Sequence, residues 1–337
     1  MQRSAPESRR PMSEDMPPEQ PTAPASDHAD PAWWSDVSGE SDGTRPLDTH
    51  AVLAQAETTD RRPGETEPLD DDTTLCETPP PPPAIAAAAM RHIGQVRATN
   101  QDAIYTLISS IPREAGDATL GLFVVADGMG GHEGGEIASR MAVAAVARRV
   151  IADLLIPAIE GTINVSLQAL MVEAVQDANR AIWEHARLTG SDMGTTCTAA
   201  LLLGRSLYIG HVGDTRAYLI DTGGIHQLTT DHSAVGRLIE MGQLDPTEAR
   251  DHPLRSQLYR TVGQHPEIAV DLVFQPIGDA THLLLASDGL WGCVEEETML
   301  RIVRGIESPQ RAVRALVDAA NRAGGPDNIA AILVRLV

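Results

Sequence analysis

Prolines cluster at one end of this chain, and this limits where a compact fold can form. Fifteen of the 23 prolines lie within residues 1–85, and five of them are consecutive at 79–83. The same segment carries 18 acidic and 6 basic side chains, a net charge of −12. Such a segment buries too little apolar surface to offset its conformational entropy. We therefore predict a disordered, proline-rich, acidic tail over residues 1–85 and one folded domain over residues 86–337, with a globular pattern and core strands from about residue 90.

The rest of the chain alternates between the hydrophobic periods of strands and helices. Apolar segments bounded by Gly, Asp or Pro predict strands at 103–111, 120–126, 195–203, 206–212, 215–220, 268–274, 282–286 and 329–336. Apolar residues every third or fourth position predict helices at 134–155, 163–188, 233–241, 295–304 and 309–322. Tight turns at Gly204 and Gly213 favour an antiparallel meander across 195–220. Two long helices between strand groups favour a layered α+β domain over an alternating βαβ sheet.

The charge of the chain excludes several classes of function. It carries 47 acidic and 26 basic side chains, a net charge of −21, and contains no lysine. Such a surface is unsuited to nucleic-acid phosphates or anionic lipid, so we expect no nucleic-acid and no membrane partner. The absence of lysine also disfavours P-loop, kinase and Schiff-base chemistry, each of which uses a lysine.

The cysteines and the apolar segments of the chain indicate where in the cell the protein is located. Cys76, Cys197 and Cys293 are far apart and form no CxxC pair, which fits neither a disulfide framework nor a zinc ribbon. The first 30 residues contain no apolar signal segment, and no apolar run reaches 18 residues. We therefore expect a cytoplasmic protein.

Three apolar strand segments lead into or out of an aspartate, at Asp127-Gly128, Asp288-Gly289 and Asp327-Asn328. An ionised carboxylate at the end of a buried strand is costly unless it is paired. With no lysine and few arginines nearby, the natural partner is a metal ion, and oxygen ligands favour Mg²⁺ or Mn²⁺ over zinc. One Asp-Gly pair is more often a turn, but three at strand ends favour a metal site.

Arg97 stands five residues before Asp102, at the start of a predicted strand. The planar fork of donors on arginine suits phosphate, and an acidic metal cluster beside one arginine suits hydrolysis of a phosphate ester. The spacing alone is equally consistent with a surface ion pair between Arg97 and Asp102.

Seven motifs occur in order between about residue 90 and the last residue. They are Arg97-x-x-Asn-Gln-Asp102, Val125-Ala-Asp-Gly-Met-Gly-Gly-His132-Glu-Gly-Gly-Glu136, Met193-Gly-Thr-Thr196, His211-Val-Gly-Asp-Thr-Arg216, Leu228-Thr-Thr-Asp-His232, Ser287-Asp-Gly-Leu290 and Asp327-Asn-Ile329. Together they resemble the metal-dependent type 2C (PPM) Ser/Thr protein phosphatases, and more narrowly the bacterial-type branch of that family. The resemblance does not cover the tail.

This resemblance implies a four-layer α/β/β/α sandwich, in which helices flank two antiparallel sheets, and makes residues 86–337 the phosphatase catalytic domain. A two-metal site is implied at one end of the sandwich. The roles that the resemblance implies are Asp127 bridging both ions, the Gly128 carbonyl completing one site, Asp288 and Asp327 holding the other, Arg97 binding phosphate, and Asp102 orienting waters. Asp192 matches, more loosely, a ligand of a third ion.

Two positions depart from the family pattern. Gln101 stands where many relatives have Glu, and we expect this to tune a water-mediated contact rather than abolish it. Met129 stands where the eukaryotic branch has a His proposed as general acid. Protonation of the leaving group would then come from His132, from a metal-bound water, or from neither. A structural role at a helix N-terminus is the alternative for His132.

The resemblance implies a monomeric phosphoserine/phosphothreonine protein phosphatase with two Mn²⁺ or Mg²⁺ ions, or three if Asp192 contributes. Its partners would be phosphorylated proteins, the substrates of a bacterial Ser/Thr kinase. A hydroxide bridging the two ions would attack phosphorus without a phosphoenzyme. No cysteine here precedes the anion-binding loop that a cysteine nucleophile requires. The alternatives are a catalytically weak phosphatase fold used for binding or sensing, and a phosphatase of small phosphate esters.

Overall fold

The computed structural model describes residue 1 and residues 85–111, 116–131, 134–245, 248 and 252–336. The predicted disorder of the tail, over residues 1–85, concerns a segment that lies almost wholly outside the described residues. The strands are β1 (Ala86–His92), β2 (Asp102–Ile111), β3 (Ala118–Met129), β4 (Gly194–Thr195), β5 (Cys197–Leu203), β6 (Ser206–Val212), β7 (Arg216–Ile220), β8 (Ile225–Gln227), β9 (Asp271–Pro276), β10 (His282–Ala286) and β11 (Ile329–Arg335).

The helices include two long ones, α2 and α4, and several shorter ones. They are α2 (Gly134–Val150), the π-helical turn η2 (Ile151–Leu155), α3 (Ile156–Ile159), α4 (Leu167–Thr189), α5 (Ala234–Glu240), α6 (Asp288–Trp291), α7 (Glu296–Gly305) and α8 (Pro309–Arg322). Helix α4 is preceded by the N-cap Ser166, whose side chain accepts from the N–H of Ala169, and is followed by Gly190 in the left-handed conformation. Within the described ranges, no helix is both long and apolar enough to cross a membrane.

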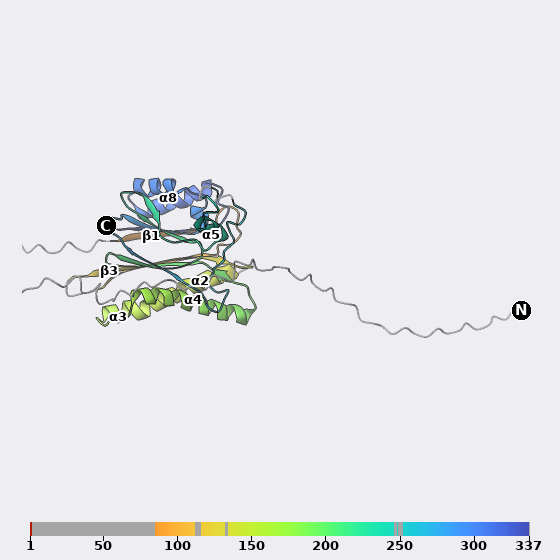
Figure 1. Cartoon of the computed structure of the whole chain (residues 1–337), viewed down its shortest axis with the longest axis horizontal. Helices are drawn as coiled ribbons and strands as arrows, with labels where there is room; N and C mark the ends of the chain where they lie inside the picture. The colour runs from red at the N-terminus through yellow and green to blue at the C-terminus, as the bar shows by residue number, and fades with distance from the viewer. Residues whose placement is uncertain (2–84, 112–115, 132–133, 246–247, 249–251, 337) are drawn as a thin grey trace, which may run out of the picture. The chain divides into compact units, whose positions relative to one another are not determined.

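Two antiparallel sheets form the centre of the fold. The first has the strand order β1-β11-β10-β7-β8, and the second has the order β2-β3-β5-β6-β9, with β4 pairing on β3. Helices α2 and α4 cover the outer face of the second sheet, and α8 covers the outer face of the first (Figure 1). The expected four-layer α/β/β/α sandwich is therefore confirmed.

The core consists of three apolar layers separated by the sheets. In β3, Leu122 and Val124 face the helices α2 and α4, whereas Phe123 and Val125 face the other sheet. Side chains of the first sheet likewise divide between the inter-sheet layer and the layer under α8. Because β3 is buried on both faces, its sequence is an almost continuous apolar run instead of an alternating one.

The predicted meander is only partly correct. Strands β5 and β6 pair antiparallel as expected, but β7 pairs with β10 in the opposite sheet. The chain crosses between the sheets at residues 213–215, immediately after β6. Gly213 adopts a φ of 111°, and a Cβ on it would lie 2.5 Å from Cβ of Thr196. A segment expected to be a tight turn is therefore a crossing that glycine permits.

The expectation that no core strand begins before about residue 90 is wrong. Strand β1 begins at Ala86 and pairs with β11 over its whole length, from Ala86 opposite Arg335 to His92 opposite Ile329. Its four consecutive alanines carry little periodic signal, so the strand is stabilised by pairing with β11 and by packing against α8 rather than by local propensity.

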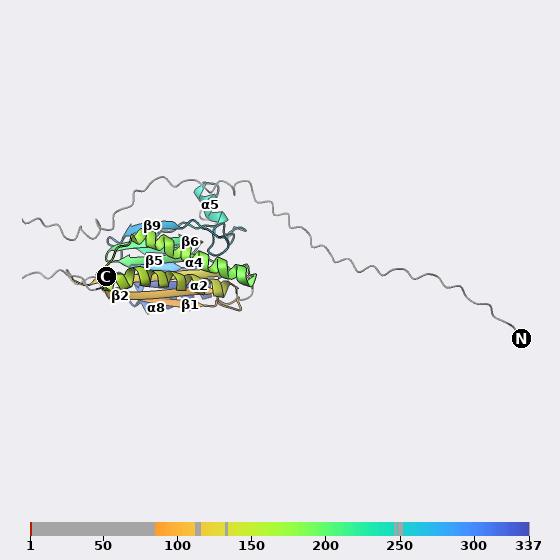
Figure 2. The ribbon, with the colours of Figure 1, turned by 90° about the horizontal axis from the view of Figure 1, so that it is seen from below.

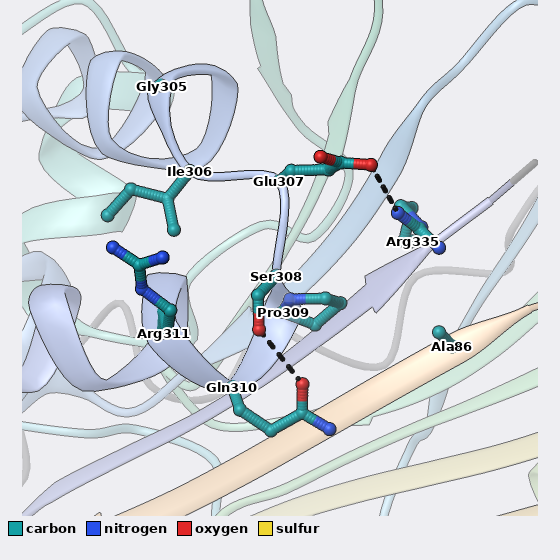
Figure 3. Close-up of a pocket in the computed structure, with 9 residues that line it drawn as sticks. All are labelled: Ala86, Gly305, Ile306, Glu307, Ser308, Pro309, Gln310, Arg311 and Arg335. Carbon is teal, nitrogen blue, oxygen red and sulfur yellow. Dashed lines mark hydrogen bonds and ion pairs between the residues drawn. The ribbon is translucent and has the colours of Figure 1, made fainter.

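A groove of about 460 Å³ lies at the opposite end of the first sheet from the predicted site residues (Figure 3). Its lining includes Ala86 and Arg335, which pair at one end of β1 and β11, whereas Asp327 lies beyond the other end. Six residues of strand separate the two ends, about 20 Å. The groove therefore belongs to a different part of the surface.

We predict that a chain starting at Ile85 keeps its melting temperature within about 2 °C, whereas a chain starting at Gly94 loses at least about 5 °C. The reason is that every described strand pairing lies between Ala86 and Arg335, so only the second truncation removes β1. Thermal unfolding of the two truncations beside the full chain measures this. A large loss from the first truncation would contradict the boundary.

Candidate functional site

Four aspartates from distant parts of the chain converge at one end of the sandwich. Asp102 opens β2 and lies directly opposite Asp127, near the end of β3. Asp288 follows β10 at the start of α6, and Asp327 lies two residues before β11. Ser287 hydrogen-bonds to Asp102, and Gln101 to Asn328, so the segments that carry Asp288 and Asp327 meet the end of β2, and the four acids form one cluster.

Only one of the two carboxylate oxygens of Asp102 accepts a hydrogen bond from a described residue. The Ser287 hydroxyl donates to Oδ2 of Asp102 (2.9 Å) and accepts from the backbone N–H of Ala330 (2.8 Å), so it joins β2 to β10 and β11. Oδ1 of Asp102 is buried without a hydrogen-bond partner among the described residues, and so is Oδ1 of Asp288. Buried acceptors that lack a donor mark a place where a cation or water is needed.

Burial and mutual repulsion raise the pKa values of these carboxyls. Burial, together with the charges of Asp288 and Asp327, raises the pKa of Asp102 to about 7, although the Ser287 hydrogen bond acts in the opposite direction. Burial and the charge of Asp327 raise the pKa of Asp288 to about 6. The pKa of Asp127 is raised well above its usual value, first by burial and then by Asp102. Without a cation the cluster opposes its own ionisation.

Asp214 belongs to this cluster and is absent from the residues predicted as site members. It lies in the crossing between β6 and β7 and is 6% exposed. Burial raises its pKa well above the usual value, and the charge of Asp288 adds to the effect. The signal in the sequence is the His211-to-Arg216 motif, but Asp214 there was expected in a hairpin turn. Only the crossing between sheets brings it to the site.

The backbone around Asp127 is held by neutral side chains. Its N–H donates to Oγ1 of Thr196 (2.9 Å), and its carbonyl accepts from Oγ1 of Thr195 (2.8 Å) and from the N–H of Thr196 (2.8 Å). Gly128 is buried where the start of α2 approaches, and a Cβ on it would lie 2.0 Å from the carbonyl oxygen of Gly135. The predicted metal-site residues Asp127 and Gly128 therefore occupy one rigid strand end.

Arg97 forms an ion pair with Asp327 and not with Asp102. Its Nη2 lies 2.6 Å from Oδ2 of Asp327, and its side chain is 52% exposed. The hydrogen bond with Asp327 raises the pKa of the guanidinium. The alternative of a surface pair with Asp102 is wrong, because Asp102 is buried beside Ser287.

Asn328 fixes the loop that carries Arg97, and it too is absent from the predicted site residues. Its Oδ1 accepts from the N–H of Gln101 (2.7 Å), and its Nδ2 donates to the carbonyls of Ile93 and Thr99 (2.9 Å each). The Asp-Asn pair in the sequence is the signal, but its partners lie more than 200 positions away. Asn328 therefore determines where Arg97 stands relative to Asp327.

Two predicted site residues, Asp192 and His132, have no described contact with the four aspartates. Asp192 is exposed just before β4, and its Oδ1 accepts a long hydrogen bond, 3.5 Å, from the N–H of Gly131. His132 lies outside the described residues.

The donor set fits hydrated hard cations. Among the described residues, no three His, Cys, Asp or Glu side chains converge tightly enough to enclose a metal by themselves. Mg²⁺ commonly keeps several waters and binds through one or two carboxylates, so such closure is not required. The oxygen-only donors and the two unpartnered carboxylate oxygens suit Mg²⁺ or Mn²⁺ and not zinc.

A family model described as "Protein phosphatase 2C" matches residues 91–333. The Mycobacterium tuberculosis serine/threonine protein phosphatase PstP is 35% identical over 246 residues, which cover 72% of this chain and 43% of that relative. The Listeria monocytogenes serine/threonine phosphatase stp is 33% identical over 215 residues, which cover 63% of this chain and 83% of that relative. This chain thus spans less than half the length of the first relative.

Solved structures have the same arrangement. The crystal structure of the M. tuberculosis phosphatase PstP/Ppp matches with a TM-score of 0.63 and 35% identity, over 75% of this chain and 98% of that one. The crystal structure of the catalytic domain of PstP in complex with two manganese ions matches with a TM-score of 0.62 and 32% identity, over 75% of this chain and 98% of that one.

We predict that the metal-free protein becomes less stable as the pH rises. The raised pKa values of Asp102 and Asp288 mean that the native state binds more protons than the unfolded state between about pH 4 and pH 7, so the free energy of unfolding falls through this range. The melting temperature in chelator should be lower at about pH 8 than at about pH 5, and Mn²⁺ should raise it more at the higher pH.

The Asp102→Asn variant should show a smaller pH dependence, because it removes one of the titrating groups. Asp318→Asn, a change at an exposed position on α8, is the control and should behave like the unmodified protein. A metal-free melting temperature that rises from the acidic to the alkaline condition would contradict this account.

Proposed function

The chain belongs to the protein phosphatase 2C family, and on this premise we propose that it is a metal-dependent protein phosphatase acting on phosphoserine and phosphothreonine. The observation that carries the proposal is the convergence of buried and half-buried carboxylates beside a half-exposed arginine at one end of the sandwich. A cation and a phosphate dianion together would satisfy both groups. Residues 86–337 would form the catalytic domain.

The ligands we propose follow from the cluster. Asp127 would contact two ions, with the carbonyl of Gly128 completing one shell and with Asp288 and Asp327 in the other. A third ion would use Asp192 with Asp288. When bound, Mn²⁺ or Mg²⁺ ions of this kind supply a hydroxide nucleophile near neutral pH and offset the charge on the phosphate. The manganese complex of PstP, a relative, supports the choice of ion.

Arg97 would bind the phosphate. One nitrogen of its guanidinium is engaged by Asp327, and the half-exposed side chain leaves other N–H donors for two phosphate oxygens. Asn328 holds the loop, so Arg97 is pre-organised before substrate arrives.

Asp102 would orient water in the site. Ser287 occupies its Oδ2, so the unpartnered Oδ1 is the atom available to accept from water. Met129 offers no proton to the departing serine or threonine oxygen, which leaves His132 and solvent as the sources.

Membership of the protein phosphatase 2C family also underlies what we propose for the substrates, the partners and the location of this protein. The relatives are named as serine/threonine phosphatases, which supports phosphorylated proteins, made by a bacterial Ser/Thr kinase, as substrates. We propose that the protein acts as a cytoplasmic monomer and that it binds neither nucleic acid nor membrane.

The Asp127→Asn and Asp288→Asn variants should each lose about a hundredfold or more of kcat, because each removes a carboxylate worth several kcal/mol of charge stabilisation through the metal site. Turnover of a phosphothreonine peptide across a Mn²⁺ titration measures this. Activity above one tenth of the unmodified protein at saturating Mn²⁺ would overturn the assignment.

Comparison of two substrates separates the proposal from its competitors. A phosphothreonine peptide should have a higher kcat/KM than p-nitrophenyl phosphate, because the proposed phosphate ligand Arg97 is half-exposed and can be reached by a residue within a peptide. The reverse order would favour a phosphatase of small esters. Absence of turnover with either substrate, despite Mn²⁺ binding, would favour a binding or sensing module.

The Arg97→Ala variant should raise KM for the peptide and weaken inhibition by inorganic phosphate, with a loss of about 2–3 kcal/mol in kcat/KM. Arg180→Ala is a matched control, because Arg180 is 64% exposed and forms an ion pair with Asp177 of 2.5 Å on α4. The control should leave both constants unchanged. If KM and phosphate inhibition also stayed unchanged in Arg97→Ala, Arg97 would be purely structural.

A further inference from the structure

The crossing between the two sheets is a short segment that carries one acid of the cluster. Residues 213–215 leave β6 and enter β7, with Gly213 at a positive φ of 111°. Asp214 is buried there, and its carbonyl oxygen lies 3.0 Å from Nε1 of Trp291 on α6, the helix that begins at Asp288, so the two acids belong to neighbouring segments. Repulsion between like charges would push the crossing away from α6, so hydrogen bonds must hold it in place.

Most hydrogen bonds of the crossing attach it to elements that carry no member of the cluster. The N–H of Gly213 donates to Nδ1 of His232 (3.0 Å), and its carbonyl accepts from the N–H of His232 (2.7 Å). The carbonyl of Thr215 accepts from Oγ1 of Thr198 (2.9 Å). These bonds fix the path of the backbone but not its spacing from Asp288.

One hydrogen bond joins the crossing to α6, the helix that begins at Asp288. The indole Nε1–H of Trp291 donates to the carbonyl oxygen of Asp214 (3.0 Å). Trp291 is three residues after Asp288, so both lie on the same helical turn. Among the described residues, no other hydrogen bond links residues 213–215 to α6.

The indole is itself fixed by an arginine. The guanidinium of Arg216 lies over the Trp291 ring, 3.6 Å from its centroid, a cation–π geometry. Arg216 also holds Asp231 with two nitrogens, Nε to Oδ1 (2.9 Å) and Nη2 to Oδ2 (2.7 Å), and donates to the Tyr218 hydroxyl (3.1 Å). The side chains of Arg216 and Asp231 are only 20% and 10% exposed. Their ion pair therefore leaves the Trp291 ring little freedom to turn.

We propose that Trp291 is a positioning residue of the metal centre: its indole N–H, oriented by Arg216, holds the backbone of Asp214 at a set distance from Asp288. The proposal rests on the proposed function, because it concerns the same cluster. Two carboxylates held at that spacing despite their repulsion are prepared for a divalent cation, and the hydrogen bond removes the cost of bringing them together when the cation binds.

The Trp291→Phe variant tests this with little other change, because phenylalanine keeps an aromatic face for Arg216 and removes only the indole N–H and ring volume. Isothermal titration with Mn²⁺ should show about a fivefold higher dissociation constant, the effect of one neutral hydrogen bond. In metal-free protein, hydrogen–deuterium exchange of the peptide covering 206–218 should be faster. kcat should recover at saturating Mn²⁺.

Trp183→Phe is the matched control, because Trp183 on α4 also lies beside an arginine, Arg187, at 5.9 Å from the ring centroid. It should leave Mn²⁺ affinity and exchange at 206–218 unchanged. If Trp291→Phe unfolds, benzothienylalanine at position 291 keeps the bicyclic shape and lacks only the donor, and it should show the same fivefold change.

The outcomes separate the two proposals. Unmodified protein that binds no Mn²⁺ would overturn the proposed function and this inference together. Unmodified protein that binds Mn²⁺, beside a Trp291→Phe variant of equal affinity and equal exchange, would overturn this inference alone. Faster exchange at 206–218 with the expected loss of affinity would support it.

Discussion

The structure depends on keeping like-charged carboxyl groups together at the end of an apolar sandwich. Asp102 is almost fully buried, and burial and the neighbouring charges raise its pKa and that of Asp288. A cluster of this kind costs stability in the absence of a cation. The three apolar layers on and between the sheets provide the favourable free energy that offsets this cost. The four layers, seen edge-on in Figure 1 and from the side of α2 and α4 in Figure 2, hold the strand ends rigid where the acids meet.

Neutral side chains position the acids without adding charge. Ser287 stands directly before Asp288 and binds Asp102, whereas Asn328 stands directly after Asp327 and binds the loop of Arg97. In Ser287-Asp288 and in Asp327-Asn328, an acid of the cluster is therefore adjacent in sequence to a side chain that orients a neighbouring element. The same logic, extended to Trp291 on the helix of Asp288, underlies the proposed positioning of Asp214. Hydrogen bonds from uncharged groups can fix geometry while a cation is absent.

Local pattern predicted much of the fold. The strands at 206–212 and 282–286 have the predicted ends, and so does the helix at 309–322, because a strong period and clear boundary residues coincide there. Strand β1 is absent from the predicted strands because alanine has no strong preference for a strand. Strand β7 was predicted as a strand but in the wrong sheet. Periodicity indicates what kind of element forms, but it carries no information on which edge that element joins.

The sequence by itself determined the chemistry of the candidate site: oxygen donors, an arginine and no lysine, placed at the ends of apolar strands. It also determined the layers, because residues with strand and helix periods must bury their apolar faces against one another. Only the tertiary structure decided that Asp214 joins the cluster, that Arg97 pairs with Asp327 instead of Asp102, and that Trp291 reaches the crossing. These contacts join residues about 75 to 230 positions apart. Their formation depends on how whole strands pair and pack, and local sequence patterns do not encode that choice.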